Sequence, residues 1–107
     1  TVKAPRVVFS DLAVADILAQ ADWYELQSDR RLAKRWERAV TSSLLRLVKT
    51  PRAGALCGFK ADALRATRRL PVTGFSAHLI FYKVSGNQIH VLRVVHGARD
   101  LDRLFSE

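Results

Sequence analysis

The sequence lacks the paired cysteines of a disulfide-bonded protein and the long apolar runs of a membrane-spanning one. Its 107 residues contain one cysteine, Cys57, so no disulfide can form within the chain. This favours a reducing compartment. No apolar run approaches the roughly 18 residues that a membrane-spanning helix needs, and no signal peptide is recognisable. We therefore expect a cytoplasmic protein that does not associate with a membrane.

Acidic residues are scarce in the middle of the chain. Residues 38–99 hold eleven Lys and Arg but a single acid, Asp62. The flanking segments are neutral or slightly acidic, so the positive charge of this middle part exceeds the net charge of +8 of the whole chain. The sequence therefore excludes paired carboxylates for acid–base catalysis from the middle. Its charge favours polyanionic or acidic partners.

Metal, nucleophile and phosphate sites each lack the residue spacing that they need. The only histidines are His78, His90 and His96, and no pair of them has the close spacing of a zinc site. Cys57 has no candidate base beside it in the sequence. The five glycines are scattered and form no phosphate-binding loop. We expect neither a metal nor a cofactor.

What is present is the composition of one folded domain. Apolar residues make up 49% of the chain and charged residues 26%. These proportions are typical of a globular protein. A chain of this length needs only one hydrophobic core, so we predict a single domain spanning residues 1–107.

The first half predicts two helices after a short strand at 6–9. The Ser10-Asp11 pair can cap the first helix, whose apolar residues recur at steps of three and four. Ser28-Asp29 can end this helix and cap a second, which runs to about Val48. So short a connection predicts an antiparallel helical hairpin.

The second half predicts strands at 64–70, 76–84 and 88–96. The last two join as a hairpin across Ser85-Gly86-Asn87. A short helical turn is expected after Asp100. The resulting order is β-α-α-β-β-β-α, an α+β fold in which a helical hairpin packs on a small, mostly antiparallel sheet.

Cationic side chains fall into two groups. The outer face of the second helix carries Arg31, Lys34, Arg35, Arg38, Arg46 and Lys49, a pattern that is also typical of a solvated surface. The predicted strands and their exit carry Arg65, Arg68, Arg69, Lys83, Arg93, His96 and Arg99. Such a set can bind RNA phosphates or the acidic surface of another protein.

Arg93 stands out because it lies in an apolar strand, between Leu92 and Val94. A guanidinium there must find an acid, a carbonyl group or a ligand, because an unpaired buried charge is very costly. A structural pair with Asp100 or with a loop carbonyl, and a role in ligand binding, are equally open.

Three stretches resemble the RelE/ParE superfamily of toxins: Arg69–Val72, His78–Val84 and Ile89–Asp100. The most specific stretch is the last, with the pattern I-x-V-L-R-V-x-H-G-A-R-D. The resemblance implies the β-α-α-β-β-β order. It also implies that the chain is the toxin of a bacterial type II toxin–antitoxin module and that it binds a cognate antitoxin.

The superfamily contains two activities. Its RelE-like members cleave mRNA in the ribosomal A site with lysines, arginines and a C-terminal tyrosine, whereas ParE-like members poison DNA gyrase. The arginine after the last strand is present here as Arg99, but the tyrosine position falls on Phe105 and another arginine position on Leu79. The paired lysines have Leu70 and Val72 as their nearest positions. These differences imply the ParE-like branch.

The resemblance thus implies a ParE-like inhibitor of DNA gyrase that is not itself an enzyme. Its predicted target-binding residues are Arg69, Lys83, Arg93 and Arg99. The alternative is a RelE-like, ribosome-dependent mRNA endoribonuclease, with a site formed by Arg65, Arg68, His96 and Arg99. A third possibility is an inactive toxin that is retained to assemble a repressor complex with its antitoxin.

Antitoxins of this superfamily are acidic and partly disordered, and they fold onto apolar grooves and basic surface. The residues predicted to contact the antitoxin are Trp23, Leu26, Trp36, Arg31, Arg35 and Arg38. In the alternative, the aromatic side chains fill the core between the helices and the sheet.

Overall fold

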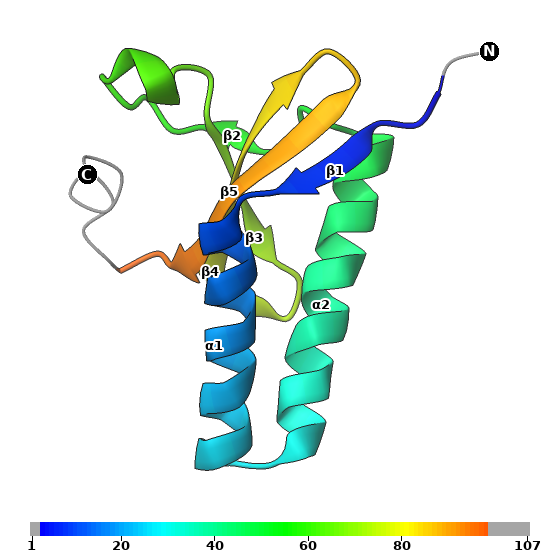
Figure 1. Ribbon diagram of the computed structural model, residues 1–107, viewed down its shortest axis with the longest axis vertical. Helices are drawn as coiled ribbons and strands as arrows, with labels where there is room; N and C mark the ends of the chain where they lie inside the picture. Colours follow the sequence, from blue (N-terminus) through cyan, green and yellow to red (C-terminus); the bar gives the residue numbers. More distant parts are fainter. Residues whose placement is uncertain (1–2, 99–107) are drawn as a thin grey trace.

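The computed structural model describes residues 3–98, which form a helical hairpin packed on a five-stranded sheet (Figure 1). The elements are β1 (Arg6–Phe9), α1 (Asp11–Gln27), α2 (Arg30–Lys49), β2 (Ala55–Leu56), β3 (Arg68–Val72), β4 (Phe75–Ser85) and β5 (Gln88–His96). The strand order is β1-β5-β4-β3-β2, in which only the β1–β5 pair is parallel. The predicted α+β fold class is confirmed.

Both helices begin at side-chain caps that the sequence predicts. The Ser10 hydroxyl accepts the Ala13 N–H at 3.0 Å, and the Asp29 carboxylate accepts the Leu32 N–H at 2.9 Å. Each bond satisfies one of the free N–H groups of a helix start. Only Ser28 and Asp29 separate the helices, so they lie antiparallel, and their turn projects beyond the strands (Figure 1).

The core lies between the hairpin and one face of the sheet. Its largest fully buried side chains are Trp36, Tyr82, Leu47 and Ile80. The Trp36 ring packs against Phe75 and His78, with centroids 5.4 and 4.8 Å apart, and its indole N–H donates to the Ile17 carbonyl at 3.1 Å. Burial of so large a ring with its one polar group satisfied fixes α2 against both α1 and the sheet.

The β4–β5 hairpin follows its prediction closely. β5 has the predicted bounds, and β4 is longer than predicted by one residue at each end. Ser85 pairs with Gln88, so Gly86 and Asn87 form the loop, and Gly86 adopts a φ of +57°. A tight hairpin turn needs this left-handed backbone, which glycine adopts at little cost.

The strand predicted at 64–70 is wrong at its start. Residues Asp62–Leu64 form a 3₁₀ turn, and β3 begins only at Arg68. The turn is held by bonds between near neighbours, such as the Leu64 N–H to the Ala61 carbonyl at 3.0 Å. Such short-range bonds leave no periodic pattern of apolar residues in the sequence. The two-residue strand β2 was not predicted, and the predicted C-terminal helical turn lies outside the described residues.

Candidate functional site

A groove of about 810 Å³ lies between α1 and the adjoining ends of β4 and β5. It is lined from α1 by Asp16, Ala19, Gln20, Trp23 and Tyr24, and from the strands by Phe75, Ser76, Ala77, His78, Val94, Val95 and His96. No α2 residue lines it. The strand residues of this groove come from the start of β4 and from the last part of β5, which extends beyond its parallel partner β1.

The floor of the groove is aromatic. His78 is only 8% exposed and packs edge-on against Trp36, while the exposed His96 faces it from β5 with ring centroids 5.3 Å apart. Burial, and then the neighbouring His96, lower the pKa of His78 below its ordinary value of 6.5. His78 is therefore neutral at physiological pH, and the floor suits an apolar side chain of a partner.

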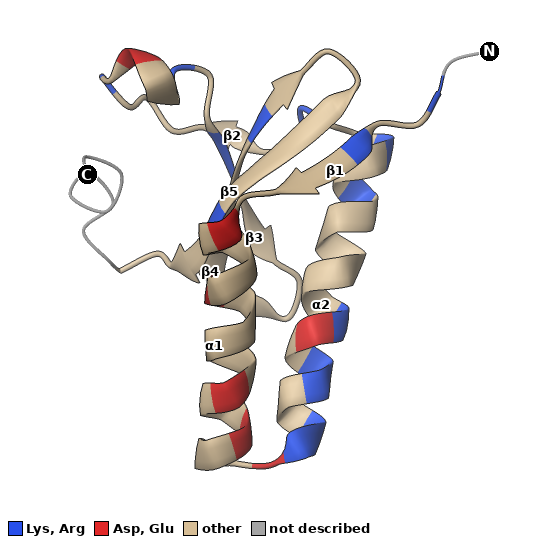
Figure 2. Cartoon of the chain, viewed as in Figure 1, with Lys and Arg blue, Asp and Glu red and all other residues tan. Residues whose placement is uncertain are grey.

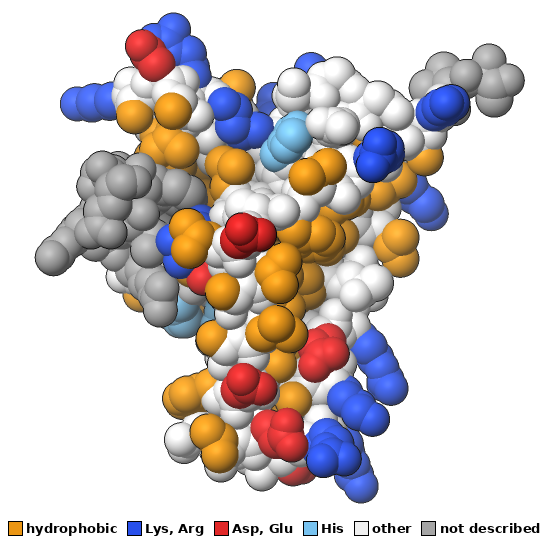
Figure 3. All heavy atoms as spheres, viewed as in Figure 1, with side chains coloured by type: hydrophobic (Ala, Val, Ile, Leu, Met, Phe, Trp, Pro, Cys, Tyr) orange, Lys and Arg blue, Asp and Glu red, His pale blue; other side chains and the backbone are white. Residues whose placement is uncertain are grey.

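The outer surface of α1 continues the apolar character of the groove. Five large apolar side chains of this helix are solvent-exposed: Leu12, Val14, Leu18, Trp23 and Leu26. Trp23 is 54% exposed and Leu26 83% exposed, near the turn of the hairpin. Figure 3 shows these apolar side chains running down α1 between acidic ones. Large apolar side chains gathered on a surface are typical of an interface with another protein.

Asp16, which lines the groove, forms an ion pair that fastens α1 to the edge of β5 that has no partner strand. The Arg93 guanidinium donates to both oxygens of Asp16, at 2.7 and 2.9 Å, and the Val94 N–H donates to the same carboxylate at 3.0 Å. Both charged side chains are 11% exposed. The hydrogen bonds that Arg93 donates to Asp16 raise the pKa of Arg93 above its ordinary value, although burial opposes this. Asp16 thus accepts a backbone hydrogen bond from a part of β5 with which β1 is too short to pair.

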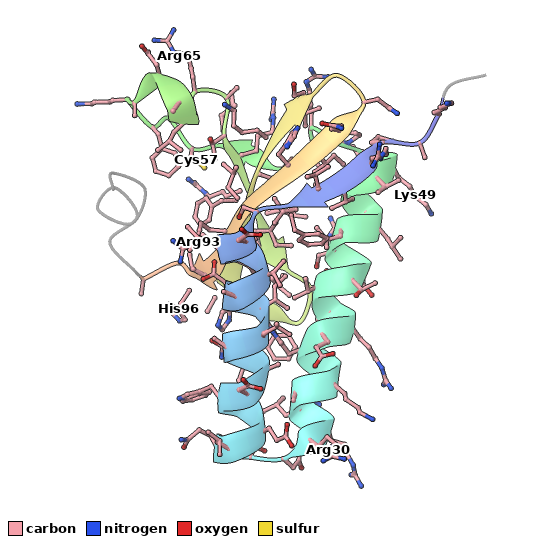
Figure 4. All side chains as sticks on the ribbon, in the orientation of Figure 1. Arg30, Lys49, Cys57, Arg65, Arg93 and His96 are labelled. Atoms are coloured by element: carbon pink, nitrogen blue, oxygen red, sulfur yellow. The ribbon has the colours of Figure 1, made fainter. Side chains whose placement is uncertain are left out.

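The partner of Arg93 corrects one expectation. Asp16, 77 residues away in the sequence, is the acid that pairs with it, whereas the predicted Asp100 lies outside the described residues. Because its guanidinium is bound to Asp16 and is nearly buried, we assign Arg93 a structural role, and its part in target binding stays a prediction (Figure 4). The signal in the sequence was a charge in an apolar strand, which demands an acid somewhere in the chain.

The other predicted target-binding residues lie on the sheet face opposite the helices. Arg69 pairs with Phe81 across the β3–β4 ladder and is exposed. Lys83, two residues along the same face of β4, donates to the Ala63 carbonyl at 3.0 Å. Arg99 lies outside the described residues. The structure thus places two of the four side chains on one face.

The residues of the alternative nuclease site do not converge. The exposed Arg65 pairs with Asp62 at 2.8 Å, and Arg68 donates to the carbonyls of Arg52 and Gly54. His96 is across the sheet, on the other side of β4 and at its opposite end. Figure 4 shows Arg65 and His96 well apart. Among the described residues, these three side chains form no common site.

The residues predicted to contact an antitoxin divide into three groups. Trp23 and Leu26 are exposed beside the groove, as that role requires. Trp36 is fully buried, so its prediction is wrong, and the alternative that it fills the core is confirmed. Arg31, Arg35 and Arg38 are exposed on α2, which the groove does not reach.

Residues 3–98 give little support for a metal site, a reactive cysteine or a membrane-spanning helix. No three His, Cys, Asp or Glu side chains in this range are grouped as a metal site would need. Burial raises the pKa of the Cys57 thiol, only partly opposed by Arg69, so the reactive thiolate is disfavoured. No helix in this part of the chain is long and apolar enough to cross a bilayer.

Comparisons with known proteins agree with this architecture. The family model described as "ParE toxin of type II toxin-antitoxin system, parDE" matches residues 7–101. A solved structure, the chromosomal ParDE toxin–antitoxin system from P. aeruginosa, superposes with a TM-score of 0.71 over 87% of this chain and 96% of that one, at 18% identity. Curated protein sequences contain no significant match. Since the family model spans nearly the whole chain, the protein belongs to the ParE family of type II toxin–antitoxin toxins.

Proposed function

We propose that this ParE-family toxin arrests growth by binding DNA gyrase, and that a cognate antitoxin masks it by filling the α1 groove. Family membership is the observation that carries the gyrase target. The separation of Arg65, Arg68 and His96 supports it, because phosphoryl transfer needs its cationic groups converged on one phosphate. The proposal places the protein in the cytoplasm, where gyrase acts.

The sheet face opposite the helices is the surface we assign to gyrase. Arg69 is exposed there, and Lys83 lies on the same face at the centre of the sheet. The rigid strands hold both cations in place, so they can bind acidic side chains of a protein without much loss of conformational freedom. We assign Arg99, which lies outside the described residues, to target binding from its place in the family motif.

Purified toxin is expected to inhibit the supercoiling of relaxed plasmid by gyrase. The variant Arg69→Gln/Lys83→Gln should raise the concentration for half-inhibition about tenfold, because two interface charges are lost. The variant Lys3→Gln/Arg6→Gln removes equal charge from the N-terminal end and should inhibit like the wild type. Gyrase that is unaffected, while mRNA is cut in a reconstituted translation reaction, would establish the nuclease alternative instead.

The groove fits an antitoxin segment that carries apolar side chains. Its floor is apolar and aromatic, and Trp23 and Leu26 extend the apolar surface along α1. A disordered segment that folds onto such a surface gains most of its affinity from a few large apolar contacts. We therefore assign the antitoxin to α1 and to the groove rather than to the cations of α2.

The variant Trp23→Ala/Leu26→Ala is expected to weaken antitoxin binding about 30-fold or more, because truncating central apolar side chains typically costs at least about 2 kcal/mol. Calorimetry with the cognate antitoxin measures this. Urea unfolding should change little, since both side chains are mostly exposed.

Leu45→Ala is the matched control for this variant. Leu45 is 60% exposed but lies on α2, away from the groove. Its substitution should leave antitoxin affinity within about twofold of the wild type. Equal losses in both variants would remove the groove from the antitoxin interface.

A further inference from the structure

The solvent face of α2 carries a row of six cations and has one acid beside it. Arg31, Lys34, Arg35, Arg38, Arg46 and Lys49 are all exposed. Figure 2 shows them along the side of α2 that faces away from α1. Glu37 is the only acid in the helix sequence. It is exposed three residues after Lys34, so it borders the row of cations on one side.

Within residues 3–98, none of these six side chains forms an ion pair. The one salt bridge to α2 joins Arg30 to Glu25 at 3.6 Å, at the start of the helix. Cations spaced three and four residues apart repel each other along a helix. The fold therefore holds a like-charged surface that its own acids do not neutralise.

The two helices differ sharply in what their exposed faces offer to a partner. α1 exposes five large apolar side chains, whereas α2 exposes only Leu45. Interfaces with proteins have an apolar core, whereas those with nucleic acids are more polar and far more positive. The face of α2 thus fits a partner that is recognised mainly by charge.

The cations of α2 are grouped at the two ends of the row. Arg31 to Arg38 form one group, and Arg46 and Lys49 the other, with the exposed Thr41, Ser42 and Leu45 between them. Arg38 and Arg46 are eight residues apart, a rise of about 12 Å along a helix. The major groove of B-DNA is also about 12 Å wide.

From this juxtaposition we propose that α2 binds duplex DNA through its phosphate backbone, with its two cation groups on opposite walls of the major groove. The residues between them, Thr41, Ser42 and Leu45, then face the base edges. The site goes beyond the proposed function, because a toxin that binds gyrase needs no DNA contact of its own. It assigns Arg31, Arg35 and Arg38 to nucleic acid.

The test is the affinity of the full chain for a fluorescent 20-base-pair duplex, measured by anisotropy between 50 and 200 mM salt. The variant Arg31→Gln/Lys34→Gln/Arg35→Gln/Arg38→Gln should bind at least tenfold more weakly at 100 mM salt. Each lost phosphate contact lowers the slope of log affinity against log salt by about 0.9, so the slope should fall by about three to four. Circular dichroism checks that the variant remains folded.

The matched control removes four exposed cations elsewhere, as Lys3→Gln/Arg6→Gln/Lys60→Gln/Arg65→Gln. Its DNA affinity should fall less than threefold. Equal losses in the two variants would show attraction by net charge and overturn the site. It would also be overturned if single-stranded DNA bound as tightly as the duplex, or if poly-L-glutamate of equal charge competed as well as duplex DNA. Gyrase inhibition is scored separately, so failure of either proposal is recognised independently.

Discussion

The variant Asp16→Ala is expected to lower the free energy of unfolding by about 3–5 kcal/mol, as measured by urea denaturation. The substitution leaves the Arg93 guanidinium without its counter-charge at 11% exposure, and it also leaves the Val94 N–H without its acceptor. Breaking a buried ion pair by removing one partner is costly because the remaining charge is uncompensated. The loss is a large fraction of the stability of a small domain.

Two further variants distinguish the contribution of the ion pair to stability from the general effect of losing an acidic side chain. Asp22→Ala removes an exposed carboxylate from the same helix and should change stability by no more than about 0.5 kcal/mol. Asp16→Ala/Arg93→Met should be more stable than Asp16→Ala, because methionine removes the stranded charge. If Asp16→Ala unfolds at the same urea concentration as Asp22→Ala, then Asp16 does not hold α1 on the sheet edge.

The elements that the sequence predicts well are those determined by neighbouring residues. Ser10 and Asp29 reach backbone groups three residues away, so the start of each helix is visible in a few letters of sequence. The bounds of β5 and the turn at Gly86 are likewise local, because loop length and backbone conformation set the hairpin register. Such features can be predicted without knowledge of the tertiary structure.

The features that were predicted wrongly depend on contacts between distant segments. Arg93 was correctly recognised as needing a partner, but only the packing of α1 across β5 selects Asp16. Trp36 lies on an apolar stripe that could equally face the core or a partner, and its burial depends on Phe75 and His78 from the sheet. The groove is a product of the same packing, since its walls come from segments more than 50 residues apart.

The two helices expose different kinds of side chain, and this difference links the fold to its proposed partners. α1 is fastened by Asp16 and leaves apolar side chains exposed, whereas α2 contributes Trp36 to the core and leaves cations exposed. Two of the surfaces that bear cations are the sheet face that carries Arg69 and the outer face of α2. An apolar antitoxin segment and a polyanion then occupy different sides of one hairpin.

The second large effect is expected from Gly54→Ala, which should destabilise the fold by about 3 kcal/mol or more. A Cβ at this position would lie 2.6 Å from the Tyr82 hydroxyl and 2.7 Å from the Arg69 carbonyl oxygen. The carbonyl belongs to the backbone of β3, so it cannot move aside without disturbing the sheet. Overpacking and loss of the 2.8 Å hydrogen bond from the Gly54 N–H to Tyr82 add to one another.

Two companion variants make the cause of the Gly54→Ala effect measurable by urea unfolding even if that protein is hard to purify. Tyr82→Phe keeps the ring but leaves the buried Gly54 N–H unpaired, which should cost about 1–3 kcal/mol. Gly58→Ala meets no atom within 4 Å, so only its left-handed backbone, with φ of +73°, is strained, at about 1–2 kcal/mol. Because the clash at Gly54 involves the Tyr82 hydroxyl, adding Gly54→Ala to Tyr82→Phe should cost less than adding it to the wild type. Equal costs in the two backgrounds would place the whole clash at the Arg69 carbonyl. A Gly54→Ala protein as stable as Gly58→Ala would contradict the close packing of this loop against the sheet.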